Sequence, residues 1–171
     1  MDSPVSEAKV YRIHIPMRPK AVQSVKMGRG FAYVPKQTRL WKEEAQVYIR
    51  EQVTLPPTPL PVIVRKFEYI FRLPTTAKKH IADAVRAGAE IPYMGTVDVT
   101  DNLNKGIVDI CKGIVFLDDH QIWKCCEIKK VYGLEDGIKL EFITCPDIFL
   151  VSGKTAEEEL YERNNKVPRD R

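Results

Sequence analysis

Residues 97–121 read VDVTDNLNKGIVDICKGIVFLDDHQ, an apolar stretch with aspartates before and after it. Its apolar residues recur at spacings of three and four, which is typical of an α-helix with one face in the core. They are Leu103, Ile107, Ile110, Cys111 and Ile114. Gly113 is expected to end the helix, because glycine readily adopts the left-handed conformation found there. The stretch therefore predicts a buried helix with an acidic group near each end.

Those acidic groups suggest a site for a metal ion. They consist of Asp98 and Asp101 before the helix and Asp118 and Asp119 after it. Hard divalent cations such as Mg²⁺ bind carboxylate oxygens, waters and phosphate oxygens. If the chain turns back beside the helix after Gly113, the four carboxylates can converge. Lys105 lies one turn after Asp101, outside the apolar stripe, where it can contact the same phosphate.

Each of these residues also has a structural explanation. Aspartate is common at helix N-caps and in turns, so any one of the four can serve only there. Lys105 can equally form an ion pair with Asp101 or Asp109 on the helix surface. The functional interpretation depends on the two acidic groups and the lysine occurring together.

Charge is distributed unevenly along the 171 residues. Residues 1–95 contain 16 Lys/Arg against 8 Asp/Glu, whereas residues 96–171 contain 11 against 15. A basic first half suits a polyanionic partner, and an acidic second half suits a cation site. The simpler alternative is that the charged side chains of both halves only face solvent.

The remaining composition argues for an intracellular globular protein. The N-terminus lacks the basic and apolar regions of a signal peptide, and no apolar run approaches the roughly 20 residues that span a bilayer. The four cysteines form no C-x-x-C pair, so an all-cysteine zinc site is disfavoured and reduced, mostly buried thiols are expected. The histidines are too scattered along the chain to indicate a metal cluster by themselves.

The rest of the chain predicts strands and helices in an irregular order. Strands are expected at 9–15, 31–34, 62–73, 121–132 and 137–144, with the last two joined as a hairpin by GLEDG. Helices are expected at 39–53, with Thr38 as N-cap, at 76–89, with Thr75 as N-cap, and over 155–164. The result is an α+β fold: a single domain whose mixed, largely antiparallel sheet has helices packed on one face.

The stretch at residues 98–122 resembles the signature of the RusA family of Holliday junction resolvases. The family's pattern runs D-x-D-N-L-x-K, then an apolar helix ending L/I-D-A-L-N-G, then V-x-x-D-D-x-Q-V. The matching residues are Asp101, Asn102, Leu103, Lys105, Asp109, Gly113, Val115, Asp118, Asp119, Gln121 and Ile122. IPMRPKAVQ (15–23) and FAYVPKQTRLWKEE (31–44) resemble the family's basic loop and its Y-T-P-x-x-T stretch, so the likeness spans roughly residues 9–145.

The match departs from the pattern at one aspartate. The family's first aspartate stands two residues before the second, where this chain has Val99. Asp98 stands three residues before, as if Thr100 were inserted, and a bulged loop is expected to let Asp98 take that role.

The resemblance implies a homodimeric endonuclease that nicks four-way DNA junctions symmetrically with Mg²⁺ or Mn²⁺. It implies Asp98, Asp101 and Asp119 as metal ligands, with Asp118 supporting Asp119 or sharing its metal. Catalysis is assigned to Lys105, Asp101 and Asp119. The DNA backbone would contact Arg18, Lys20, Lys26, Arg29, Lys36 and Arg39. Residues 1–150 form the nuclease domain and residues 151–171 a charged tail with a short helix.

Such a protein would act on four-way or branched DNA in the cytoplasm, near the nucleoid of a bacterium or with phage DNA, and not at a membrane. Two other classes stay open. One is a non-catalytic basic DNA-binding module whose aspartates only cap helices, and the other is an assembly protein that uses the last strands and the tail as an interface. The base sequence at the cut, and any action on flaps or forks, do not follow from the sequence.

Overall fold

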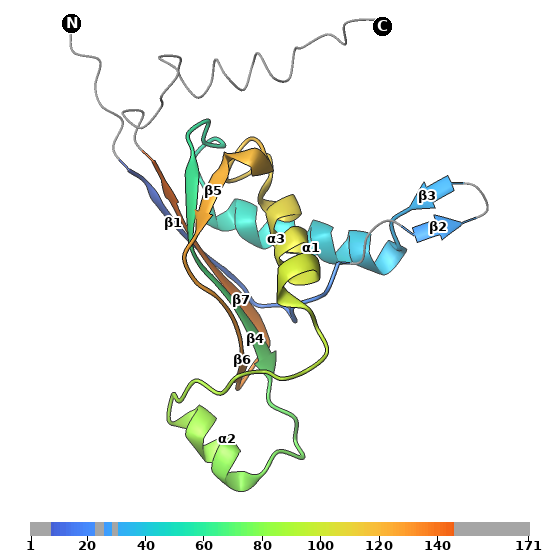
Figure 1. Ribbon diagram of the computed structural model, residues 1–171, viewed down its shortest axis with the longest axis vertical. Helices are drawn as coiled ribbons and strands as arrows, with labels where there is room; N and C mark the ends of the chain where they lie inside the picture. The colour runs from blue at the N-terminus through green and yellow to red at the C-terminus, as the bar shows by residue number, and fades with distance from the viewer. Residues whose placement is uncertain (1–7, 23–25, 29–30, 146–171) are drawn as a thin grey trace, which may run out of the picture.

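The computed structural model describes the backbone of residues 8–22, 26–28 and 31–145 (Figure 1). Within these ranges, the side chains of residues 26–28 and 31–33 and of Asp101 lie outside the description. The elements are β1 (Val10–Ile15), β2 (Lys26–Gly28), β3 (Phe31–Tyr33), α1 (Lys36–Gln52), β4 (Val62–Arg72), α2 (Lys79–Arg86), the π-helical turn η1 (Val99–Leu103), α3 (Asn104–Cys111), the 3₁₀ turn η2 (Asp119–Gln121), β5 (Ile122–Cys125), β6 (Ile128–Gly133) and β7 (Gly137–Thr144). The tail helix expected over 155–164 falls outside the described residues.

A five-stranded mixed sheet is built around β4, the longest strand. One edge of β4 pairs with β7, which also pairs with β1, and both pairings are antiparallel. The other edge pairs in parallel with β5 and then, further along, with β6. Strands β2 and β3 form a separate two-stranded hairpin that projects beyond α1 (Figure 1). These elements confirm the expected single α+β domain with a mixed sheet.

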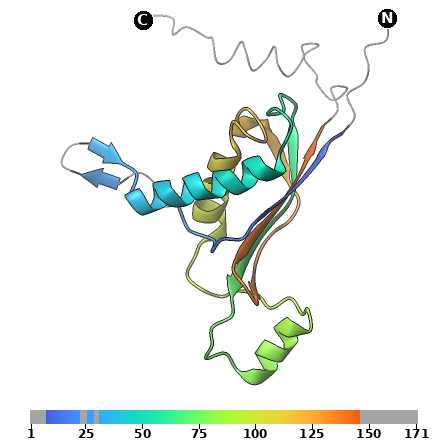
Figure 2. The same cartoon turned by 180° about the vertical axis from the view of Figure 1, so that it is seen from behind.

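One face of the sheet packs against the hydrophobic core. In β1 the exposed and buried residues alternate, as the sequence pattern predicts. Figures 1 and 2 show α1 and α3 on the same side of the sheet, whereas α2 lies beyond its far end. Helix α1 buries Trp41, Ala45 and Ile49, and α3 buries Ile107 and Ile110. Because α1 and α3 lie over the same core, the segment around α3 is held firmly in place.

The expected hairpin between the last two strands is wrong. Residues 121–132 are not one strand but contribute to β5 and β6, and β6 does not pair with β7. Instead, residues 134–136 cross the end of β4, where the Arg72 N–H donates to Asp136 Oδ1 at 2.8 Å. The hairpin fails because β4 offers both of its edges, so β6 and β7 pair with it on opposite sides.

Both predicted helix caps are also wrong. Helix α1 begins three residues earlier than expected, after Pro35, and Thr38 is buried inside it. Proline has its φ already fixed near helical values, which favours a helix start close to it. Helix α2 is shorter than expected and begins after Lys78, so Thr75 lies outside it.

The helix expected from the opening stretch is present. Leu103, Ile107 and Ile110 are each at most 1% exposed, and Gly113 ends the segment with a φ of 75°. The first turn is π-helical, so η1 contains one more residue than an α-helical turn would. Thr100, the residue that the chain has in excess of the family pattern, lies in this turn.

The loop after β1 packs directly on this helix. The Val22 N–H donates to the Asn102 carbonyl at 3.1 Å, and Val22 is 6% exposed. A Cβ on Gly106 would lie 2.5 Å from Cγ2 of Val22, which is closer than van der Waals contact allows. Gly106 therefore lets the loop, which carries Arg18 and Lys20, approach the helix.

We predict that Gly106→Ala destabilises the fold by about 1–2 kcal/mol, because overpacking costs roughly 1–3 kcal/mol while alanine regains up to about 1 kcal/mol of helix propensity. Urea unfolding measures this free energy. The matched variant Val22→Ala removes the clashing methyl groups, so Gly106→Ala should cost less, or become favourable, in that background. Purely additive effects of the two substitutions would contradict the contact.

Candidate functional site

The chain after α3 forms a tight acidic turn. The Asp118 carboxylate accepts a hydrogen bond from the Asp119 N–H at 2.7 Å, and Gln121 Oε1 accepts one from the Asp118 N–H at 2.7 Å. Gln121 is buried, and its Nε2 donates to the carbonyls of Thr58 and Leu60 at 2.8 Å each. Gln121 thus fixes the turn to the segment that leads into β4.

Asp118 is ionised under ordinary conditions. Lys112 Nζ donates to its Oδ1 at 2.7 Å, and His120 Nδ1 lies 3.5 Å from its Oδ2. The ammonium of Lys112, together with hydrogen bonds from Asp119, lowers the pKa of Asp118 to about 2. The same contact raises the pKa of Lys112.

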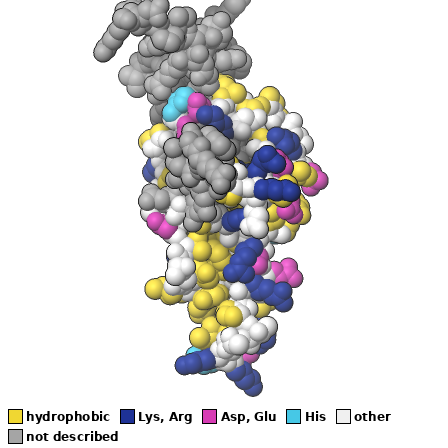
Figure 3. Space-filling model, turned by 90° about the vertical axis from the view of Figure 1, so that its right-hand side faces the viewer, with side chains coloured by type: hydrophobic (Ala, Val, Ile, Leu, Met, Phe, Trp, Pro, Cys, Tyr) yellow, Lys and Arg dark blue, Asp and Glu magenta, His cyan; other side chains and the backbone are white. Residues whose placement is uncertain are grey.

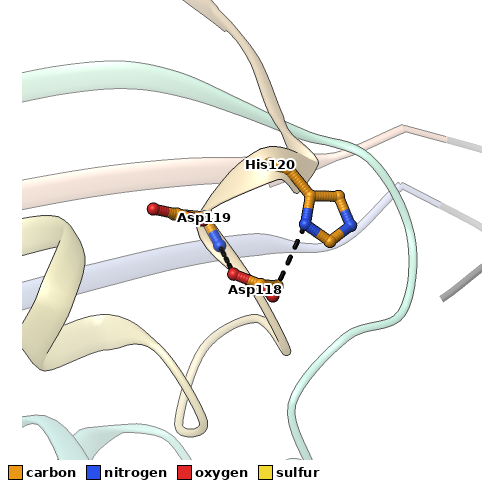
Figure 4. Close-up of side chains that lie close together, drawn as sticks. All are labelled: Asp118, Asp119 and His120. Atoms are coloured by element: carbon orange, nitrogen blue, oxygen red, sulfur yellow. Dashed lines mark hydrogen bonds and ion pairs between the residues drawn. The ribbon is translucent and has the colours of Figure 1, made fainter. Parts of the chain in front are cut away.

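Three potential metal ligands meet in this turn. Asp118, Asp119 and His120 each place one ligand atom within 4.8 Å of the others, and Figure 4 shows them side by side. Among the described side chains, this is the group of three or more that could hold an ion. Carboxylate and imidazole donors suit divalent cations, so the residues present fit a metal centre.

The other end of the helix carries the second predicted acidic group. Asp98 precedes η1, and its Oδ1 accepts hydrogen bonds from the N–H and hydroxyl of Thr100 at 2.9 Å each. Asp101 lies within η1, and its side chain is outside the description. Lys105 is exposed one turn further along, in α3. Asp109, one of its two expected ion-pair partners, instead contacts Lys42 at 2.8 Å.

Buried contacts hold this end in place. The Tyr69 hydroxyl donates to Asn104 Oδ1 at 2.7 Å, and burial raises the pKa of Tyr69. Lys130 Nζ donates to the carbonyls of Gly95 and Val97 at 3.1 and 2.7 Å, just before Asp98. Both contacts lead from the sheet to the residues around the acidic group.

The two predicted acidic groups flank the helical segment, one before and within η1 and the other after α3. Asp98 precedes the helical segment, whereas Asp118 contacts Lys112 at its far end (Figure 1). At 1.5 Å per residue, these ends are about 20 Å apart. The turn after Gly113 carries the chain away from the start of the helix and toward β5.

Two of the basic residues expected to contact DNA lie on the loop that packs against η1. Arg18 is 66% exposed and Lys20 is half-buried, both on the loop that packs against η1. Lys36 and Arg39 are exposed in the first turn of α1, and Arg39 is paired only loosely with Glu43 at 3.7 Å. The Lys26 side chain and Arg29 lie outside the described residues.

Sequence reasoning missed two members of the acidic turn. The scattered spacing of the three histidines gives no sign of His120, and the available signal is its place beside Asp118 and Asp119. The role of Lys112 depends on the direction of the turn after Gly113, which no local pattern specifies. The expectation of mostly buried cysteines is also only half right, because Cys125 and Cys126 are exposed and Cys111 and Cys145 are buried.

A compact acidic turn that can hold a cation, an exposed lysine, and a basic loop at the helix start suit a protein that acts on phosphodiesters. The family comparison is more specific. The family model of endodeoxyribonuclease RusA matches residues 15–142, so the chain belongs to the RusA family. No curated protein matches the chain. Family membership implies endodeoxyribonuclease activity on Holliday junctions.

No helix in the described part of the chain is both long enough and apolar enough to cross a bilayer.

We predict that Lys112→Met raises the pKa of Asp118 from about 2 toward its ordinary value of 3.8, because the ammonium that favours the ionised form is lost. A carboxyl-carbon NMR titration reports this shift directly. In the parent protein, the stabilisation from ionised Asp118 should be complete above about pH 4 and lost as pH falls toward 2. An unchanged Asp118 midpoint in Lys112→Met would show that the ion pair does not form in solution.

Proposed function

We propose that this protein is a homodimeric, Mg²⁺-dependent Holliday junction resolvase that makes paired symmetric nicks, with Mn²⁺ able to replace Mg²⁺. The observation that carries the proposal is the turn Asp118–Asp119–His120, in which three potential ligands lie within 4.8 Å in a chain of the RusA family. The ionised Asp118 supplies negative charge for a cation at neutral pH.

The separation of the two acidic groups supports the dimer. Because the acidic groups flank a helical segment about 20 Å long, we assign Asp98 and Asp101 of one chain and Asp118 of another to the same site. Two chains related by a two-fold axis, with their α3 helices antiparallel, place the start of one helix beside the end of the other. Two such composite sites then arise at once, which suits the two nicks of a four-way junction.

The surface on this side of the molecule is suitable for such pairing. Figure 3 shows apolar side chains gathered along the lower half of the face, with lysine and arginine side chains beside and below them. Exposed apolar patches can mark protein contacts, and basic borders suit DNA.

The chemistry assigns a separate task to each group. A bound divalent cation lowers the pKa of a coordinated water and offsets charge on the leaving oxygen. Asp118, Asp119 and His120 of one chain, with Asp98 and Asp101 of the other, would hold the cation. Lys105 contacts the non-bridging oxygens of the scissile phosphate, where charge grows in the transition state.

The basic residues bind the DNA without reading its sequence. Arg18 and Lys20 reach solvent from the loop that Val22 fastens to η1, so they flank the acidic residues at the start of the helix. Lys36 and Arg39 extend this surface along α1, and Lys26 and Arg29 are assigned to it from the sequence. Phosphate contacts position the substrate but carry no base information, which is appropriate for an enzyme that recognises a branched shape.

We predict that Asp119→Asn abolishes junction cleavage but leaves junction binding unchanged or tighter, because a ligand and a charge that repels phosphate are lost together. The measurement is cleavage of a synthetic four-way junction with and without Mg²⁺, alongside a gel-shift assay in EDTA. Asp83→Asn, on the exposed surface of α2, is the matched control and should cut normally. If Asp119→Asn still cuts at saturating Mg²⁺, Asp119 is not a ligand. If the parent binds without cutting, the protein is a DNA-binding module.

We predict that Lys105→Ala slows single-turnover cleavage of a bound junction by roughly a hundredfold or more while affinity changes little, since a preorganised contact to developing charge is worth about 2.7–4 kcal/mol. Lys105→Arg should recover part of the rate, because it keeps the charge but not the compact ammonium. Lys139→Ala, an exposed lysine on β7, serves as the control. A Lys105→Ala rate within a few-fold of the parent would make Lys105 a surface residue only.

A further inference from the structure

Strand β5 lies at an edge of the sheet and contains an irregularity at one residue. Ile122 pairs with Val62 and Lys124 pairs with Ile63, so Trp123 has no partner on β4. An extra residue of this kind is a β-bulge. Bulges are frequent at sheet edges and beside active sites, where they reorient a side chain. The bulge in β5 directs an aromatic residue outward from the strand that follows the acidic turn.

Trp123 is unusually exposed for an aromatic residue. Its exposed fraction is 62%, whereas the other aromatic side chains that the structure describes are buried or half-buried. A single exposed apolar residue is common on protein surfaces and needs no explanation by itself. This ring, however, is also oriented by a hydrogen bond and follows closely after the acidic turn.

The ring is held in a fixed orientation. Its Nε1–H donates to Cys145 Sγ at 3.0 Å, and Cys145 is buried with its own N–H bonded to the Pro61 carbonyl at 2.7 Å. Because the indole is anchored before any partner arrives, little side-chain entropy is lost when a flat group stacks on it. An exposed, anchored ring is a preformed stacking surface.

The position of the ring relates it to the proposed cleavage site. Trp123 follows Asp119 by four residues, so their Cα atoms are at most about 14 Å apart. Stacked bases along one DNA strand are spaced by about 3.4 Å, so the ring lies within a few nucleotides of a phosphate held at Asp119. Lys124, the next residue, is exposed and can contact the neighbouring backbone.

We propose that Trp123 stacks on an unpaired or end-exposed base at the branch point of the junction, and so positions the scissile phosphate. The inference rests on the proposed function. It adds a physical reason why the protein would select branched DNA over linear duplex. Stacking on an aromatic ring accepts any base, because every base has a π-face. A continuous duplex keeps its bases stacked on each other, whereas a branch point exposes the faces where the arms separate. Trp123 therefore favours branched over linear DNA without reading the sequence.

The intrinsic fluorescence of the protein offers a direct test. The chain has two tryptophans, and Trp41 is buried in α1 with its Nε1–H bonded to the Arg18 carbonyl at 3.1 Å. The variant Trp41→Phe leaves Trp123 as the sole reporter. It is titrated in EDTA, so that nothing is cut, with a four-way junction or with linear duplex of the same arm sequence. Anisotropy of a DNA label measures binding independently. The fluorescence of Trp123 should be quenched by the junction and not by the duplex.

Substitution at Trp123 gives the matching affinity test. Trp123→Ala should weaken junction binding by roughly 5- to 150-fold and leave duplex binding unchanged. Trp123→Phe should restore only part of the loss, because it keeps an aromatic face but lacks the bond to Cys145 that orients the ring. Equal affinities of Trp123→Ala and the parent for the junction would overturn the proposal, and so would equal quenching by duplex. A fluorescence change that depends on protein concentration without DNA would place Trp123 at a protein interface instead.

These outcomes are distinct from a failure of the proposed function. If the parent protein binds and cuts the junction but Trp123 does not respond, only the stacking role is wrong. If the parent neither binds nor cuts the junction, the resolvase assignment itself is wrong and the stacking role falls with it.

Discussion

Burial of the helical segment η1–α3 against the sheet determines where every functional group lies. Leu103, Ile107 and Ile110 are almost completely enclosed, and fully burying each such side chain is worth roughly 1.5–3 kcal/mol. The hydrogen bond between Tyr69 and Asn104 adds a polar contact within this interface. Because the segment is held along its whole length, its ends cannot approach one another. The packing that positions the acidic residues at the two ends of this segment therefore also keeps the two ends apart.

In the proposed dimer, each site combines the acidic residues at the start of one chain's helical segment with the acidic turn of the other chain. A two-fold axis then generates two such sites. A four-way junction has approximate two-fold symmetry of its own, which suits the paired nicks that we propose. The ion pair between Lys112 and Asp118 keeps the carboxylate ionised, and a bound cation would compete with the ammonium for it.

Local sequence patterns were sufficient to predict a helix or a strand when the pattern of burial lies within that one element. The spacing of Leu103, Ile107 and Ile110 predicted the helix, and the alternation in residues 9–15 predicted β1, because burial of one face is a local signal. The predicted hairpin failed because pairing depends on β4, which lies some 60 residues away in the chain and offers two edges. The acidic turn was predicted in part, since Asp118 and Asp119 were recognised but His120 was not. The family resemblance supplied the class of enzyme, which residue spacing alone could not give.

The central claim is that a catalytic site combines the start of one chain's helix with the acidic turn of another, and mixing two inactive variants tests it most directly. Asp101→Asn and Asp119→Asn are purified separately, combined under conditions that exchange subunits, and assayed on a four-way junction with Mg²⁺. Each mixed dimer then contains one composite site with both substitutions and one with neither. The account predicts recovery of about a quarter of the parent's sites, seen as single nicks rather than paired cuts. If subunits exchange but the mixture stays inactive, each site belongs to one chain and the account is contradicted.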